Sequence, residues 1–266
     1  MARGVSTVLD VSVCLLLVGA AMATLAVGIP AEGRHSVDGT PNAADDSARR
    51  LAMVTAGVPA SRNRTVHGTL AQQLAQAAVA NASLDGDPLA NDDYADAVAA
   101  ETTATTDRRV AVTARWEPYP DASLRGTMTA GETPPADADV AVTRHVVETG
   151  IDAPETAPSS FPELARALAV AYVEWHFPPE RTRAALVDGR TAPATADRYR
   201  VMARTLEVNV EAALTDANAR RANDRLAAAL AERLEADLRE RYDTPRAAAE
   251  ASSPDRAVVV VRRWDA

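Results

Sequence analysis

Lysine is absent from the 266-residue sequence, and aromatic residues make up only 4% of it. All 28 basic residues are therefore arginines, and 37 aspartates and glutamates outnumber them, which gives a formal net charge of −9. A general nucleic-acid-binding protein needs a basic surface to neutralise phosphates, so this charge balance excludes that class. The single cysteine, Cys14, excludes both a disulfide framework and a zinc site built from cysteines.

Signatures of catalysis and of cofactor binding are also missing. The 12 glycines are dispersed and form no phosphate-binding loop, and no serine stands in a Gly-x-Ser-x-Gly context. The four histidines are too scattered to form a helical set of metal ligands. Glu174 and His176 are two residues apart and face different sides of a helix. We therefore expect no metal ion, no cofactor and no enzymatic activity.

Alanine takes much of the space that larger apolar side chains fill in other proteins. There are 59 alanines, and because each buries little area, the core must be built mainly from valine and leucine. An acidic, lysine-free surface stays hydrated in concentrated salt, where attraction between exposed charges is screened within about 3 Å at 1 M. We interpret the composition as that of a salt-loving archaeon. A GC-rich genome, which enriches alanine and arginine for no structural reason, is the alternative.

The longest apolar run lies near the N-terminus. From Val11 to Ile29 there are 19 consecutive uncharged and mostly apolar residues. A helix of this length measures about 28 Å, close to the roughly 30 Å hydrocarbon core of a bilayer. Asp10 lies near one end of the run, where its carboxylate can reach the interface, and Pro30 ends it. The pattern predicts a single transmembrane helix within a leader and anchor region of residues 1–29.

Other anchoring mechanisms fit this segment less well. A cleaved secretory signal needs a small-x-small cleavage site, which Ala21-Met22-Ala23 or Ala26-Val27-Gly28 would supply, so this alternative stays open. A lipoprotein anchor at Cys14 requires a small residue before the cysteine, but Val13 stands there. Most of the apolar run also follows Cys14, so we interpret it as an apolar residue of the helix.

The opening RGVSTVLDVSVCLLLV, residues 3–18, resembles uncharacterised haloarchaeal membrane proteins that look like minor pilins or pseudopilins. The resemblance implies processing between Gly4 and Val5, after which the apolar run stays as the membrane anchor and, in a pilus, as the filament core. It implies three partners, namely the lipid bilayer, other pilin-like subunits and a secretion or assembly platform. Bacterial-type pilins carry glutamate five residues after the cut, whereas this chain has Leu9 there and Asp10 next. In an assembly, Asp10 would pair with the new amino group of a neighbouring Val5.

Beyond the anchor, the sequence predicts a flexible tether over residues 30–65 and an extracytoplasmic domain over residues 66–266. The first 21 residues of the tether, 30–50, are rich in alanine, aspartate, glycine, proline and serine without periodicity. Helical periodicity begins near Val66, and a short helix is expected around residues 92–100.

Four segments of the domain read as strands. Period-2 alternation predicts strands at Arg108–Trp116, Leu124–Ala130 and Asp139–Val147, with the first two joined by a proline-rich turn. Ala257–Arg263 contains four consecutive valines and is apolar on both faces, which is typical of a central strand. We expect these four segments to share one mainly antiparallel sheet.

The back half of the domain is predicted to be helical. One helix spans Phe161–Phe177, with Ser159 or Ser160 as its N-cap, and a short one follows over residues 180–187. Residues 196–242 carry leucines spaced by four, a stripe that drifts about 40° per step around a straight helix. We therefore expect a break near Asp216–Asn218, with a single rod as the alternative. The predicted fold class is α+β: an N-terminal transmembrane helix, then a soluble domain with a small mainly antiparallel sheet and a helical back half.

Two N-glycosylation sequons begin at Asn63 and Asn81. Basic residues alone do not orient the chain, because Arg3 precedes the apolar run while Arg34, Arg49 and Arg50 follow it. The pilin resemblance implies a single-pass protein of the cell membrane with its C-terminal domain outside, where both asparagines are candidates for glycosylation.

These patterns favour a structural function over a catalytic one. We expect a membrane-anchored, pilin-like surface protein with a structural or assembly role. The alternative is a membrane-tethered extracellular binding domain that does not assemble into a filament. Replacing residues 11–29 by another apolar sequence would leave such a binder intact, whereas a pilin-like subunit would lose its assembly.

Overall fold

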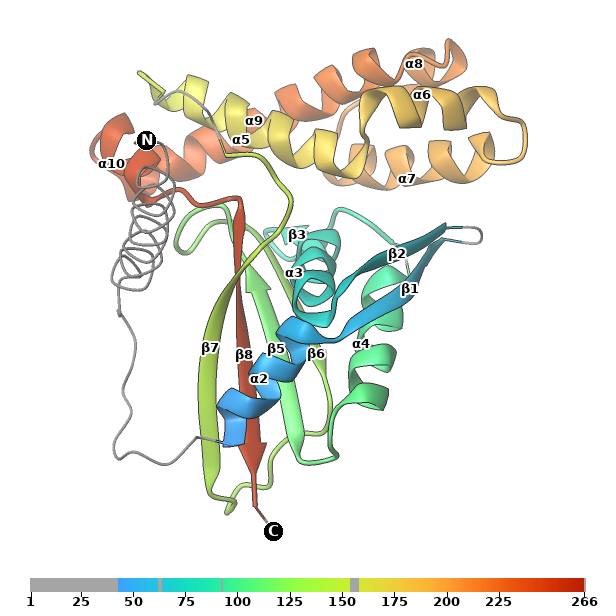
Figure 1. The fold of residues 1–266 in the computed structure, drawn as a ribbon. Helices are drawn as coiled ribbons and strands as arrows, with labels where there is room; N and C mark the ends of the chain where they lie inside the picture. The colour runs from blue at the N-terminus through green and yellow to red at the C-terminus, as the bar shows by residue number, and fades with distance from the viewer. Residues whose placement is uncertain (1–42, 62–63, 92, 154–157, 266) are drawn as a thin grey trace, which may run out of the picture. The chain divides into compact units, whose positions relative to one another are not determined.

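The computed structural model describes residues 43–61, 64–91, 93–153 and 158–265 of the chain. Its centre is a six-stranded sheet with the strand order β4-β3-β6-β5-β8-β7, in which every neighbouring pair is antiparallel (Figure 1). The strands are β3 (Ala82–Leu84), β4 (Asp87–Pro88), β5 (Val110–Trp116), β6 (Leu124–Ala130), β7 (Val140–Glu148) and β8 (Arg256–Trp264).

The pairing of β5, β6, β7 and β8 confirms the three strands predicted from period-2 alternation and the fourth predicted from the valine run. In β6, residues alternate strictly between buried and exposed, so that one face packs on the core. β8 lies between β5 and β7, as its run of valines predicted, and Val260 has Thr113 on one side and Arg144 on the other. The C-terminal segment thus becomes an inner strand of the sheet.

Three helices cover one face of this sheet: α2 (Ala43–Met53), α3 (Leu70–Ala80) and α4 (Tyr94–Thr105). Figure 1 shows α2 and α3 lying across the strands, with α4 beside α3. The approach of α3 to β6 is close, because a Cβ atom at Gly126 would overlap the carbonyl oxygen of Ala78. Glycine at this position therefore sets the spacing between the helix and the sheet.

The region predicted as a tether is folded from residue 43 onwards, where the described chain begins. After α2, strands β1 (Thr55–Ser61) and β2 (Arg64–Thr69) form a separate antiparallel hairpin. Val66 therefore lies in a strand, and the helix begins only at Leu70, after a capping box formed by Thr69 and Gln72. The hairpin is held to α3 by Gln73, whose side-chain amide donates hydrogen bonds to two backbone carbonyl oxygens of the hairpin.

The back half forms a helical layer of α5 to α10. The predicted break at 216–218 is present between α8 and α9, and a second break lies at 206–210, so the single-rod alternative is wrong. Both breaks contain a residue in the left-handed region, Glu207 and Ala217, which stops a helix. The six helices are α5 (Phe161–His176), α6 (Pro179–Val187), α7 (Ala192–Thr205), α8 (Glu211–Thr215), α9 (Ala219–Arg241) and α10 (Pro245–Ala251).

Aromatic side chains join the helical layer to the sheet. Trp116, at the end of β5, stacks on Tyr172 of α5 with 5.5 Å between ring centroids. Its indole nitrogen donates a 2.8 Å hydrogen bond to the carbonyl oxygen of Pro254. Trp175 of α5 donates in the same way to Thr149, just after β7. The few aromatic residues of the sequence are therefore concentrated at this junction.

The predicted fold class needs one correction. No helix in the described ranges is long and apolar enough to cross a membrane. The longest of them, α9 with 23 residues, has the length but carries charged side chains along its course. The described chain is thus an α+β fold of sheet and helices without a membrane-spanning helix. Residues 1–29, the predicted leader and transmembrane helix, lie outside the described residues.

Candidate functional site

Most of the predicted site residues fall outside the described part of the chain. These are Gly4 and Val5, the predicted processing site, Asp10, the predicted assembly residue, and Asn63 of the first sequon. Asn81 is described: it caps the C-terminus of α3, and its side-chain nitrogen donates a 2.8 Å hydrogen bond to the carbonyl oxygen of Thr127. A glycan at Asn81 would replace one of the two hydrogens of this nitrogen, so the bond to Thr127 would have to be made by the remaining one.

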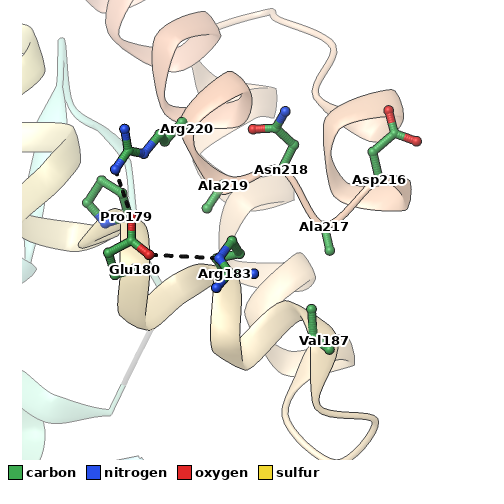
Figure 2. A pocket seen from close by; sticks show the side chains of 9 residues that line it. All are labelled: Pro179, Glu180, Arg183, Val187, Asp216, Ala217, Asn218, Ala219 and Arg220. Atoms are coloured by element: carbon green, nitrogen blue, oxygen red, sulfur yellow. Dashed lines mark hydrogen bonds and ion pairs between the residues drawn. The ribbon is translucent and has the colours of Figure 1, made fainter.

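An open depression of about 350 Å³ lies between α6 and the turn from α8 to α9 (Figure 2). Glu180 stands at its wall and accepts a hydrogen bond from Arg220 at 2.8 Å, with Arg183 at 3.8 Å. The hydrogen bond and charge of Arg220 lower the pKa of Glu180, so that its carboxylate is ionised at neutral pH. The arrangement fixes one helix against the next and leaves no free base aimed at the depression.

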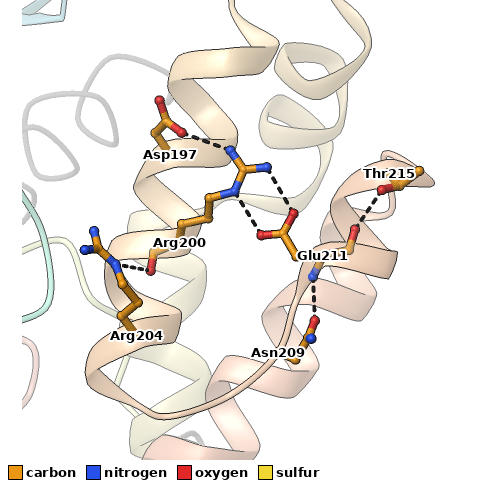
Figure 3. A network of polar contacts seen from close by, with 6 residues as sticks. All are labelled: Asp197, Arg200, Arg204, Asn209, Glu211 and Thr215. Carbon is orange, nitrogen blue, oxygen red and sulfur yellow. Dashed lines mark hydrogen bonds and ion pairs between the residues drawn. The ribbon is translucent and has the colours of Figure 1, made fainter.

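A second polar network clamps α7 to α8 (Figure 3). Arg200 donates two parallel hydrogen bonds to Glu211, of 2.9 and 3.0 Å, and a third to Asp197 at 2.9 Å. This two-pronged geometry is the one in which arginine binds carboxylates best. Its hydrogen bonds raise the pKa of Arg200 and lower that of Glu211, so both groups stay charged. The clamp holds helices together and offers no unpaired group to a ligand.

His176 is the most perturbed titratable group of the helical layer. It lies at the end of α5 with its ring edge-on to Tyr172 and Trp175, at 4.7 and 5.0 Å between centroids. Burial, with the charge of Arg198 as a smaller cause, lowers its pKa to about 3. Its Nε2 atom has no hydrogen-bond partner among the described residues. A neutral imidazole enclosed by aromatic rings serves packing, as the two-residue spacing from Glu174 indicated.

A buried carboxylate joins the helical layer to the β5–β6 turn. Asp237 of α9 accepts hydrogen bonds from the Tyr119 hydroxyl at 2.8 Å, the Ser123 backbone N–H at 3.0 Å and Arg241 at 2.9 Å. Burial and the neighbouring carboxylate raise the pKa of Tyr119, so its hydroxyl stays a donor at neutral pH. Both oxygens of the Asp237 carboxylate accept hydrogen bonds, so the network is a structural latch between the helical layer and the turn.

The remaining candidate is the sheet face opposite α2, α3 and α4. Three of its valines stay exposed on neighbouring strands β7 and β8: Val142 by 44%, Val146 by 65% and Val258 by 38%. Val146 and Val258 form a small apolar area, and arginines separate Val142 from it, so the face combines exposed apolar side chains with positive charge. In the strand register Val146 lies opposite Val258, and Val142 lies opposite Arg262.

Arginines surround these valines. The register places five arginines and Glu148 on this face, and Glu117 lies at its edge near Arg115 and Arg125, so basic residues outnumber acids here although the whole chain carries −9. We call this surface the valine–arginine face. It consists of Val142, Val146 and Val258 together with Arg115, Arg125, Arg144, Arg256 and Arg262.

The sequence contains a pattern that indicates this face, although the sequence analysis did not identify it. The valine run of β8 predicts a central strand that is apolar on both faces, and β8 does lie between β5 and β7. The same run places valines at outward positions of β8, on the face that no helix of the described chain covers. In β7, the outward positions Val140, Val142, Arg144 and Val146 are also mostly valines. Two adjacent strands with apolar residues at outward positions are therefore the signal to look for.

Comparison with known proteins gives one match. A sequence family described as a family of unknown function, DUF7284, matches residues 9–264. No curated protein and no solved structure matches the chain.

Proposed function

We propose that this chain, which belongs to the DUF7284 family, is a membrane-anchored, pilin-like surface protein with a structural or assembly role. The observation that carries this proposal is the valine–arginine face. A surface that leaves Val146 65% exposed beside arginines is suited to covering by another macromolecule. Glu180, Arg200 and Asp237 of the helical layer, in contrast, are engaged in ion pairs and hydrogen bonds that stabilise the fold.

The sequence supports the location that we propose. Residues 11–29 are uncharged and of the length that holds a chain in a bilayer. Processing between Gly4 and Val5 would leave this segment on the mature protein. The domain would then stand outside the cell.

Mass spectrometry of the mature protein, purified from its own membranes, tests this proposal. We expect a chain that begins at Val5 and stays in the membrane fraction after a carbonate wash. A chain that begins at Met1 or Ala2 would contradict processing. A chain that begins after Ala23 or Gly28 and is found in the medium would favour ordinary secretion.

A membrane-tethered binding domain is the second candidate, because the same face would serve a partner other than a pilin-like subunit. Replacing residues 11–29 by a scrambled apolar sequence of equal length distinguishes the two. The tethered binder would keep its partner, whereas the assembling subunit would lose incorporation into a larger complex while staying membrane-bound.

A further inference from the structure

We propose that the valine–arginine face binds the acidic α4 surface of a second copy of this chain, in a head-to-tail contact. This inference rests on the assembly role proposed above and names the surfaces through which it would occur. The argument starts from the charges of the two surfaces.

Arg256 of this face pairs with Asp255, and Glu117 lies near Arg115 and Arg125. The other arginines of the face differ from those of the helical layer in forming no salt bridge with a described residue. Arg115, Arg125 and Arg144 are exposed and form no salt bridge within the described part of the chain. A cluster of like charges raises its own electrostatic energy, which an acidic partner surface would lower. The occupant of this face must therefore be negatively charged.

The matching acidic surface is present on the same chain. Between Thr65 and Asp107 the sequence contains no arginine and no lysine. The acids of this stretch gather on α4 and the turns before it, and the exposed ones without a salt bridge in the described structure are Asp85, Asp87, Asp93 and Asp96. We call this region the acidic α4 surface.

Shape favours the same pairing. Asp93, Asp96, Ala100 and Ala104 are all exposed and follow one another at helical spacing along one side of α4. Alanine side chains are short, so this side of the helix can approach a flat sheet closely. The exposed valines would then be covered by alanines, and the surrounding arginines would meet the aspartates.

The position of α4 decides between symmetric and head-to-tail contacts. Because α4 packs on α3 and β6 on the helix-covered side, it lies on the other side of the sheet from the valine–arginine face. A contact between the two surfaces is therefore heterologous and can be repeated from copy to copy. A symmetric face-to-face dimer would instead bring arginines against arginines.

Charge reversal on each surface tests the proposal. The full mature chain in detergent would be examined by sedimentation velocity over a range of concentrations. We expect Arg144→Glu and Asp96→Arg each to weaken self-association by about tenfold or more, a factor that corresponds to 1.4 kcal/mol. The matched controls are Arg190→Glu and Asp188→Arg, which make the same charge changes at exposed positions in the turn between α6 and α7. Ala100→Arg, which adds bulk to the α4 surface, should act as Asp96→Arg does.

Mixing the two variants gives the sharpest result. Arg144→Glu retains its α4 surface and Asp96→Arg retains its valine–arginine face, so an equimolar mixture should form a one-to-one complex that does not grow. A wild-type chain that stays monomeric at every concentration would overturn the proposal, as would variants that associate like the wild type. A mixture that forms no complex would also overturn it.

An anionic membrane is the other surface that would attract these arginines, and co-sedimentation with phosphatidylglycerol vesicles distinguishes it. If Arg144→Glu reduces recruitment to these vesicles and leaves self-association unchanged, the face belongs to lipid and the proposal is wrong. Membrane retention of each variant after the carbonate wash is recorded separately. A failed self-association test therefore leaves the anchoring function standing, and a failed anchoring test leaves self-association measurable.

Discussion

The helical layer and the valine–arginine face use arginine in opposite ways. In the helical layer, arginines such as Arg200 and Arg220 are held by carboxylates on neighbouring helices. On the valine–arginine face, Arg115 and Arg144 are exposed on the same side of the sheet as Val146 and form no salt bridge with any described residue. The first region satisfies its charges within the fold, whereas the second leaves charge and apolar area for a contact. The difference separates residues that hold the structure from residues that are free to bind.

The largest effect is expected where the helical layer meets the sheet. Asp237→Ala would leave the Tyr119 hydroxyl, the Ser123 N–H and Arg241 without their shared acceptor. Breaking a buried network of this kind lowers the free energy of unfolding by about 3–5 kcal/mol. Urea denaturation measures the change. Asp224→Ala, which removes an exposed ion pair with Arg166, is the control and should change the free energy by less than about 0.5 kcal/mol. Equal effects of the two substitutions would show that Asp237 is not a latch.

The second effect depends on pH through His176. Its pKa is about 3 in the folded chain, against about 6.5 when unfolded, so the unfolded state binds a proton that the folded state excludes. The stabilisation is complete above pH 6.5 and is lost as pH falls toward 3, by about 1.4 kcal/mol for each pH unit. Free energies of unfolding measured at pH 7 and pH 5 should differ less in His176→Phe than in the wild type. Identical pH dependence in the two chains would contradict this account of the buried ring.

A smaller effect is expected at the turn between α8 and α9. Ala217 has φ of 49°, a conformation that costs a residue with a Cβ atom energy and that glycine adopts freely. Ala217→Gly should therefore raise the free energy of unfolding by about 0.5 kcal/mol. Ala219→Gly, two residues later in the first turn of α9, should lower it by roughly 1 kcal/mol. Thermal unfolding of the pair measures both, and effects of equal sign would contradict the assignment of the turn.

The smallest change in stability is expected when one arginine from each region is replaced by alanine. Arg200→Ala removes the clamp between α7 and α8 and should lower the melting temperature slightly, by an amount that shrinks in high salt. Arg144→Ala should leave the melting temperature of the monomer unchanged, because Arg144 forms no salt bridge in the part of the chain that the structure describes. An equal loss for both would mean that Arg144 also stabilises the fold.

Strands and capped helices could be predicted from the sequence because their signals are local. β5 and β6 alternate with period 2, and Ser160 followed by Pro162 marks the start of α5. The segment over α2 and β1 was missed for physical reasons. α2 is short and rich in alanine and aspartate, and β1 contains Gly57 and Pro59, so both resemble a flexible linker in composition. They are ordered by contacts with distant strands and helices, which the local sequence does not encode.

The candidate site was harder to predict because it depends on which face the helices cover. The outward positions of β7 and β8 could be listed from the alternation. That α2, α3 and α4 all pack on the other face follows from the tertiary arrangement alone. The predicted residues Gly4, Val5, Asp10 and Asn63 lie outside the described chain, so their roles remain predictions.

Hydrogen–deuterium exchange at increasing protein concentration tests the central claim most directly, because it reports on each region separately. If the valine–arginine face is an interaction surface, exchange should slow in β7 and in α4 as the chain associates, and it should not change in α5 to α9. Arg144→Glu should abolish the slowing in both elements. Exchange in β7 that is independent of concentration, or protection confined to the helical layer, would contradict the account.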